Sequence, residues 1–115
     1  MKFYQYPKCS TCRRAEKFLK QQNIDFESID ISIQPPSKDE LIGMIKAQGD
    51  KKKLFNTSGM LYREMDVKSK LPGLDDEAAA ELLSKNGMLI KRPFVIGNDV
   101  ALVGFKEELW LQITE

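Results

Sequence analysis

A strand–helix–strand pattern opens the chain and limits the folds that the rest of it can complete. Residues 2–6 alternate around aromatic side chains and predict a short strand that stops at Pro7. Residues 10–22 carry apolar side chains at helical spacing, and residues 24–31 predict a second strand whose alternation slips phase, so we expect a late start or a distortion there. Short links between these elements indicate a βαβ unit, in which the two strands run parallel.

The middle of the chain predicts a helical stretch. Ser37 and Glu40 have the spacing of a capping box, so a helix begins there, and Gly49 ends it. Asp75-Asp76-Glu77 places negative charge where the dipole of a further helix favours it. Residues of about 37–86 are therefore expected to form a helical insert.

The last part of the chain predicts a hairpin and a closing helix. Residues 90–96 and 100–103 have strand character, and the turn signal at 97–99 joins them. Residues 106–114 follow with helical spacing. We therefore expect one α/β domain over residues 1–115, with the helical insert between a βαβ half and a ββα half.

The composition removes several classes of function. The 115 residues are 42% hydrophobic and 30% charged, which is typical of a soluble globular domain. A formal net charge of +1 gives no strong field to attract nucleic acid or a membrane. The chain has no histidine, which excludes histidine acid–base chemistry, Cys–His pairs and most zinc-enzyme sites.

The N-terminal residues bear on the compartment. They are polar and interrupted by Pro7, and no run approaches the roughly 18 apolar residues of a membrane span. We therefore expect a cytoplasmic, monomeric protein that contacts neither membrane nor nucleic acid directly. In the reducing cytoplasm a structural disulfide is not expected.

Two cysteines lie at the junction of the first predicted strand and helix, in Cys9-Ser10-Thr11-Cys12. Their spacing places both sulfurs near one face of the first helical turn, where unpaired N–H groups and the helix dipole favour a thiolate. Lys8 and the two arginines at 13–14 add positive charge. We hypothesise that Cys9 is a nucleophile and that Cys12 resolves the adduct as an intramolecular disulfide.

Other interpretations of the cysteine pair stay open. A zinc site within one chain would need two more cysteine or histidine ligands, which the sequence lacks, whereas a zinc site shared across a dimer would not. The cysteines could also be inert buried residues. The position of the pair, after a strand and at the start of a helix in a βαβ unit, favours the redox interpretation.

Pro93, Arg92 and Arg63 each have two interpretations. Pro93 is either a cis proline near the site or a plain edge-strand proline, and the sequence alone favours the latter. Arg92 and Arg63 either hold an anion and steady a thiolate, or are solvated surface residues. The run 51–53 of three lysines is either a solvated loop or a binding patch, and the sequence favours the loop.

The chain resembles the ArsC/Spx family of thioredoxin-fold proteins, which includes glutaredoxin-linked arsenate reductases and the Spx transcription regulators. The resemblance covers nearly the whole chain. It rests on five segments in this order: Tyr6-Pro7-Lys8-Cys9-Ser10-Thr11-Cys12-Arg13, Leu54-Phe55-Asn56-Thr57-Ser58-Gly59, Tyr62-Arg63, Lys91-Arg92-Pro93-Phe94-Val95 and Leu102-Val103-Gly104-Phe105. It implies a thioredoxin-like fold with a four-stranded mixed sheet, and a cis Pro93 that faces the cysteine loop.

The resemblance also implies roles for individual residues. Cys9 matches the family's catalytic cysteine, and Arg63 and Arg92 match two arginines that hold the oxyanion in arsenate reductases. A third such arginine is absent, because Gly104 takes its place. The catalytic residues are thus expected to be Cys9, Cys12 and Arg92, and the substrate-binding residues Arg63, Pro93, Lys8, Ser10 and Thr11, without a metal ion.

The expected function is that of a thiol–disulfide oxidoreductase of the arsenate reductase-like type, which reduces a small or protein disulfide or an oxyanion. No bound cofactor is expected, and thioredoxin or a glutathione/glutaredoxin system would re-reduce the cysteine pair. The alternative is an Spx-type redox sensor that regulates transcription by binding the C-terminal domain of the RNA polymerase α-subunit. The near-neutral charge gives this alternative no direct DNA footprint.

Overall fold

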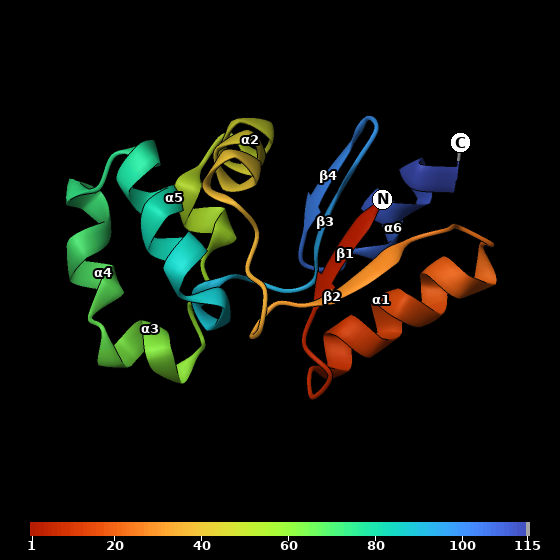
Figure 1. Ribbon diagram of the computed structural model, residues 1–115, viewed down its shortest axis with the longest axis horizontal. Coiled ribbons are helices and arrows are strands. Elements are labelled where there is room, and N and C mark those ends of the chain that lie inside the picture. Colours follow the sequence, from red (N-terminus) through yellow and green to blue (C-terminus); the bar gives the residue numbers. More distant parts are fainter. Residues whose placement is uncertain (115) are drawn as a thin grey trace.

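The computed structural model describes residues 1–114 and contains a four-stranded sheet (Figure 1). Its strands are β1 (Lys2–Gln5), β2 (Glu27–Asp30), β3 (Phe94–Gly97) and β4 (Val100–Val103). They lie in the order β2-β1-β3-β4; β1 and β2 are parallel, and the pairs β1–β3 and β3–β4 are antiparallel. The mixed sheet predicted from the sequence is therefore confirmed, and β2 starts late as the slipped alternation predicted.

Helices lie on both sides of this sheet. The α-helices are α1 (Ser10–Gln21), α2 (Lys38–Gln48), α3 (Met60–Glu64), α4 (Val67–Lys70), α5 (Asp76–Lys85) and α6 (Glu107–Trp110). Short 3-10 helices are η1 (Lys51–Leu54), η2 (Leu71–Gly73), η3 (Gly87–Leu89) and η4 (Leu111–Thr114). In Figure 1, α1 and α6 lie on one side of the sheet, and α2 to α5 form a separate helical part on the other side. The helical insert is thus a second helical layer, across the sheet from α1 and α6 (Figure 1).

Alternation along the central strands divides the apolar residues between two cores. On β1, Phe3 packs with α1 and α6, whereas the next residue, Tyr4, packs with the helical insert. On β3, Phe94 and Val95 divide in the same way. Successive side chains of a strand point to opposite faces, so the two inner strands join both layers.

Local signals account for the helix boundaries of the insert. Ser37 accepts a hydrogen bond from the Glu40 backbone, and the Glu40 carboxylate accepts one from the Ser37 backbone at 2.9 Å, so the predicted capping box is present. Gly49 ends α2 with φ of 78°, a conformation that suits glycine. Asp75 caps α5 through its carboxylate.

The last helix differs from the prediction. The sequence predicts a helix over residues 106–114, but α6 spans Glu107–Trp110 and continues as the 3-10 helix η4. Trp110 is 1% exposed, and its indole N–H donates to the carbonyl of Gly104 at 3.1 Å. This indole, packed at 5.0 Å from the ring of Phe105, fixes the helix against the end of β4. Tertiary anchoring therefore outweighs the local helical pattern.

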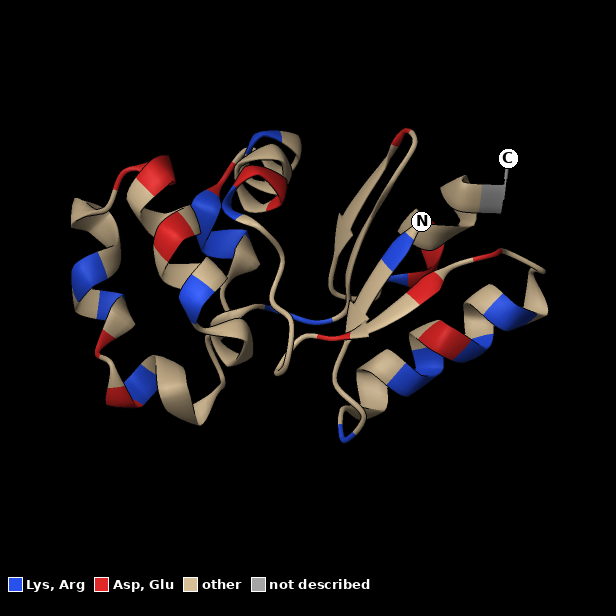
Figure 2. Cartoon of the chain, in the orientation of Figure 1, with Lys and Arg blue, Asp and Glu red and all other residues tan. Residues whose placement is uncertain are grey.

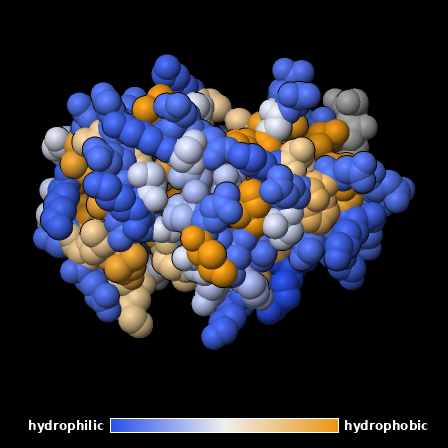
Figure 3. All heavy atoms as spheres, viewed as in Figure 1, coloured by the Kyte–Doolittle hydropathy of each residue, from blue (hydrophilic) through white to orange (hydrophobic). Residues whose placement is uncertain are grey.

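The surface is mostly polar on the face shown in Figure 3, where hydrophilic side chains surround small apolar patches. Among residues 1–114, no helix is both long and apolar enough to cross a membrane.

Candidate active site around Cys9

Cys9 is the N-cap residue of α1. A tight turn after β1, closed by a 2.9 Å hydrogen bond from the Cys9 amide to the Tyr6 carbonyl, delivers it there. Its sulfur accepts a hydrogen bond from the backbone N–H of Cys12 at 3.3 Å, in the place where serine or aspartate oxygens usually cap helices. The Cys12 N–H has no acceptor within the helix and donates to the Cys9 sulfur instead, which favours the thiolate form of Cys9.

The two cysteines have opposite environments. Cys9 is partly exposed, whereas Cys12 is 1% exposed beneath it. Burial opposes ionisation of Cys9, but hydrogen bonds from the Cys12 thiol and backbone, together with the Arg92 charge, lower the pKa of Cys9 below its ordinary value. Burial raises the pKa of Cys12 to about 12. The outer sulfur is therefore the more readily ionised of the two, and the inner sulfur holds its proton at neutral pH.

Arg92 lies beside Cys9 and is held by backbone carbonyls. Its Nη1 donates to the carbonyl of Met88 at 3.3 Å and to that of Ile90 at 3.4 Å, and its guanidinium lies 5.5 Å from the centre of the Tyr6 ring. Its Nε is buried, and among the described residues it has no hydrogen-bond partner. Arg92 thus combines a fixed position with one unused donor.

The peptide bond between Arg92 and Pro93 is cis, as the resemblance to the family implies. Pro93 is buried, and its carbonyl accepts a hydrogen bond from the Gly104 amide at 2.8 Å. This bond joins the start of β3 to the end of β4. The segments 91–93 and 103–106 therefore reach the site together.

A cleft of about 370 Å³ opens beside Cys9. Four of its lining residues are cations, and none is acidic. The lining residues are Cys9, Thr11, Arg14, Asn56, Lys91, Arg92, Val103, Gly104, Phe105 and Lys106. Figure 2 shows the basic stretch at 91–92 between the helical insert and β3, with basic residues along α1 nearby. The cleft thus places the more acidic of the two sulfurs beside a positively charged wall.

The structure assembles part of the predicted site. Cys9, Thr11 and Arg92 line the cleft, and Cys12 lies directly beneath Cys9. The other predicted substrate-binding residues do not line it: Lys8 and Ser10 are exposed at the loop and at the start of α1, Arg63 is exposed on α3, and Pro93 is buried behind Arg92. Substrate contact at these four positions stays a prediction.

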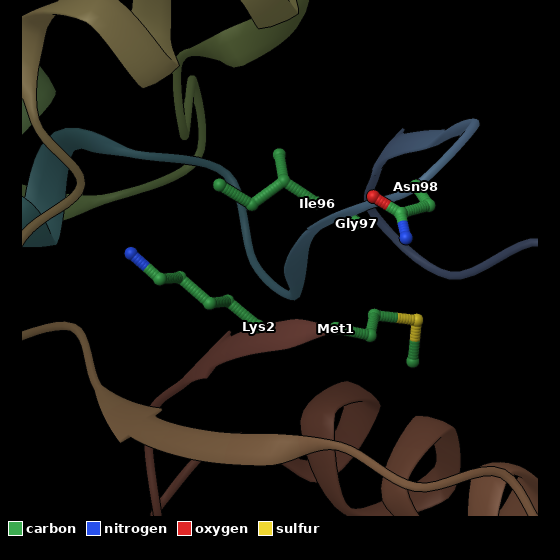
Figure 4. Close-up of a pocket in the computed structure, with 5 residues that line it drawn as sticks. All are labelled: Met1, Lys2, Ile96, Gly97 and Asn98. Atoms are coloured by element: carbon green, nitrogen blue, oxygen red, sulfur yellow. The ribbon is translucent and has the colours of Figure 1, made fainter.

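A second hollow, of about 330 Å³, lies at the other end of β1 (Figure 4). Its lining residues are Met1, Lys2, Ile96, Gly97 and Asn98. It has no cysteine, and its charged residue, Lys2, is paired with Glu40 at 3.1 Å. The four residues of β1 separate it from the cysteine loop by roughly 10 Å of strand. The cleft beside Cys9 is therefore the candidate active site.

The model of the ArsC family matches residues 4–113. This chain belongs to the ArsC family. It is 49% identical to the uncharacterized protein YusI of Bacillus subtilis over 107 residues, which cover 92% of this chain and 91% of YusI. It is 26% identical to the global transcriptional regulator Spx of Streptococcus pyogenes serotype M3 over 103 residues, which cover 89% of this chain and 75% of Spx.

A solved structure has the same architecture. The structure of a possible arsenate reductase from Streptococcus mutans is similar with a TM-score of 0.87 and 42% identity, over 94% of this chain and 95% of that one. The thioredoxin-like fold expected from the sequence is thereby confirmed, and so is the family resemblance. The similarity supports membership of a thiol-redox family without assigning a substrate.

Sequence reasoning assigned no site role to most of the cleft residues of this ArsC family member, Asn56, Lys91 and Lys106 among them. Asn56 and Lys91 lie inside segments that carry the family resemblance, but neither was expected to contact substrate. Lys106 had no sequence signal, because it reaches the cleft only when the chain returns after β4. The glycine at position 104 was such a signal for Lys91, since it leaves room for a neighbouring side chain.

Proposed function

We propose that this chain is a thiol-dependent reductase that acts on disulfides through the Cys9–Cys12 pair. The observation that carries the proposal is the unequal environment of the two sulfurs. Cys9 is accessible, caps α1 and is stabilised as a thiolate by Cys12 and Arg92, whereas Cys12 is buried directly beneath it. Membership of the ArsC family supports the same chemistry.

The reaction has two exchange steps. In the first, the Cys9 thiolate attacks one sulfur of a disulfide R–S–S–R′; a bond forms between Cys9 and R–S, and R′–S⁻ leaves. In the second, Cys12 attacks the Cys9 sulfur and releases R–S⁻, which takes up the proton that the Cys12 thiol loses. The substrate disulfide is thereby reduced to two thiols while the cysteine pair is oxidised to a disulfide. An external dithiol of the thioredoxin class, or glutathione with glutaredoxin, then restores the pair.

The first step makes the Cys12 thiol more acidic. Burial raises the pKa of Cys12, and the hydrogen bond to Cys9 and the negative charge of Cys9 raise it further. A mixed disulfide on Cys9 removes that charge, whereas the Arg92 charge, which lowers the pKa of Cys12, remains. The second thiol therefore becomes more acidic once Cys9 is occupied. We expect the resolving step to be slower than the attack and to accelerate as the pH rises.

Mass spectrometry after exposure to a small disulfide tests this function. The wild-type chain should lose two hydrogens as the pair oxidises, the variant Cys12→Ser should keep a stable mixed disulfide on residue 9, and Cys9→Ser should stay unmodified. A wild-type chain whose Cys9 remains a free thiol under these conditions would contradict the proposal. Turnover with thioredoxin, and separately with glutathione and glutaredoxin, then identifies the reductant.

Arsenate is a less favoured substrate than a disulfide. Gly104 stands where the arsenate reductases carry their third anion-holding arginine, and Arg63 lies outside the cleft. Beside Gly104, the wall of the cleft instead has the lysines Lys91 and Lys106, while Arg14 reaches the cleft from α1. Lysine is a point charge that does not reproduce the planar, two-pronged contact of arginine with an oxyanion.

A second candidate is a redox-sensing regulator of the Spx type. It is favoured by the 26% identity to Spx over most of the chain and by the cysteine pair. In this case oxidation of Cys9 and Cys12 would alter a surface that contacts the C-terminal domain of the RNA polymerase α-subunit. A pull-down with that domain, with the chain reduced and oxidised, decides the matter, and no contact in either state would remove the candidate.

A further inference from the structure

Gly104 and Lys91 both line the cleft, and the Lys91 side chain lies against the backbone of Gly104. Gly104 has φ of 74°, and hydrogen bonds fix it on both sides, from its amide to Pro93 and from the Trp110 indole to its carbonyl. A Cβ atom at Gly104 would lie 3.0 Å from Cε and 3.6 Å from Nζ of Lys91. The lysine side chain therefore passes over the bare face of this glycine, in space that any larger residue would occupy.

Within the described part of the chain, the Lys91 ammonium that lies there has no acidic partner. Among residues 1–114, the ion pairs involve Lys2, Lys20, Lys38 and Lys85, and none involves a cation of the cleft. The two glutamates that follow Lys106, at 107–108, do not line the cleft. Positive charges that converge without an acid raise the local concentration of anions and favour negatively charged ligands.

Lys91 and Arg92 act on different partners. Arg92 is the positive charge that stabilises the Cys9 sulfur, and carbonyl groups hold its guanidinium. Lys91 is exposed, and among the described residues its ammonium donates no hydrogen bond. Its charge is therefore free for a ligand that occupies the cleft in front of Cys9.

We propose that Lys91 is a specificity-determining residue of this cleft, whose ammonium over Gly104 binds a carboxylate of the substrate and selects anionic disulfides over neutral ones. This inference rests on the proposed reductase function. The chemistry of attack is unchanged: Cys9 forms a bond to one sulfur, and the other sulfur leaves with its electron pair. The carboxylate is a spectator that holds the disulfide against the basic wall.

Two disulfide reagents separate this role from general reactivity. Dithiobis-nitrobenzoate carries a carboxylate on each ring, whereas dithiodipyridine is neutral at neutral pH. Stopped-flow rates of the reduced full-length chain, each divided by the rate of free cysteine with the same reagent, should show a preference for the anionic reagent that weakens as salt is added. The variant Lys91→Met should lower the rate with the anionic reagent about fivefold, as expected for one partly screened charge pair, and leave the neutral reagent nearly unaffected.

Matched variants complete the test. Lys91→Arg keeps the positive charge and should retain the preference, and Lys46→Met removes an exposed lysine of α2 outside the cleft and should change neither rate. Equal slowing of both reagents in Lys91→Met would overturn the proposal, because Lys91 would then act through Cys9. No slowing with either reagent would overturn it as well. A wild-type chain that is inert toward both reagents would instead contradict the reductase function itself.

Discussion

The polar and charged groups near the two ends of β1 differ in whether they have hydrogen-bond or ion-pair partners. At the N-terminal end, Glu40 accepts hydrogen bonds from the Tyr4 hydroxyl, the Ser37 backbone and the Lys2 ammonium. At the C-terminal end, the Cys9 cleft collects four cations and no acid, and Arg92 Nε has no partner among the described residues. At the N-terminal end, the charges are paired with one another and join β1 to α2. At the C-terminal end, the charges of the Cys9 cleft have no acidic partner among the described residues and are available to a ligand.

The comparison teaches where stability and function reside in this chain. A buried polar group without a partner costs free energy, so it persists where a ligand or a reaction uses it. Substitutions at the N-terminal end of β1 should therefore change the free energy of unfolding and spare reactivity. Substitutions at the C-terminal end should change reactivity and nearly spare stability.

Removal of the nucleophile gives the largest expected effect. Cys9→Ser should slow reaction with small disulfides by at least about a thousandfold, because a hydroxyl does not replace the thiolate. The serine can still cap α1 through its oxygen, so the unfolding midpoint should be nearly unchanged. Stopped-flow rates and urea titrations check the two parts, and a large loss of stability in this variant would break the contrast between the two ends.

Removal of the carboxylate at the other end should have the largest effect on stability. Tyr4 is 1% exposed, and Glu40→Ala leaves its hydroxyl without this acceptor and also opens the capping box of α2. We expect the free energy of unfolding at neutral pH to fall by about 2 kcal/mol, roughly thirtyfold in the folding equilibrium. Urea denaturation measures the loss, and the rate of Cys9 with disulfides serves as the control that should not change.

The Glu40 carboxylate also makes the difference in the free energy of unfolding between the wild-type chain and Glu40→Ala depend on pH. Burial opposes ionisation of Glu40, but hydrogen bonds from the Ser37 backbone, Tyr4 and Lys2 outweigh it and lower the pKa of Glu40. Because the pKa of Glu40 is lower in the folded state, its carboxylate stabilises the fold fully at pH values above the ordinary glutamate pKa of about 4.3. This contribution to the free energy of unfolding is lost as the pH falls through the folded-state pKa. The gap between the wild-type chain and Glu40→Ala should therefore narrow at acidic pH, and a constant gap would assign the loss to packing.

Removal of the guanidinium beside Cys9 should give an intermediate effect on reactivity. Arg92 lowers the pKa of Cys9, so Arg92→Met should shift the pH profile of Cys9 alkylation to higher pH and slow the reaction at neutral pH about tenfold. Lys46→Met is the control, because Lys46 is exposed on α2 and outside the cleft. If Arg63→Met slows turnover of an anionic substrate as much as Arg92→Met does, the substrate-binding role predicted for Arg63 is supported.

Local signals in the sequence are sufficient to predict most of this fold. The capping box at Ser37, the left-handed Gly49 and the alternation on β1 each act over a few residues, and each gives the predicted element. The closing helix was wrong beyond Trp110, because its path depends on an indole hydrogen bond to the distant Gly104 carbonyl. A periodic pattern carries no information about such an anchor.

The site was predicted only in part, for the same reason. Cys9, Cys12 and Thr11 lie on one helical turn, so their proximity follows from their spacing alone. Lys91 and Lys106 enter the cleft from two other segments, which meet because Gly104 donates to the Pro93 carbonyl. The unequal burial of the two cysteines also depends on packing, and the proposed division of their roles rests on it.

Removal of the Lys2 ammonium, the exposed partner of Glu40 at the N-terminal end of β1, should have the smallest effect on the free energy of unfolding. It therefore tests which group at this end joins the two layers. The Lys2 side chain is 45% exposed, and its ion pair with Glu40 is therefore screened by solvent. Lys2→Met should cost no more than about 0.5 kcal/mol, because Tyr4 and the Ser37 backbone continue to hold the carboxylate. Urea denaturation at low and high salt measures it. A loss as large as that of Glu40→Ala would mean that the ammonium, rather than the buried hydroxyl and the helix cap, joins the two layers at this end of β1.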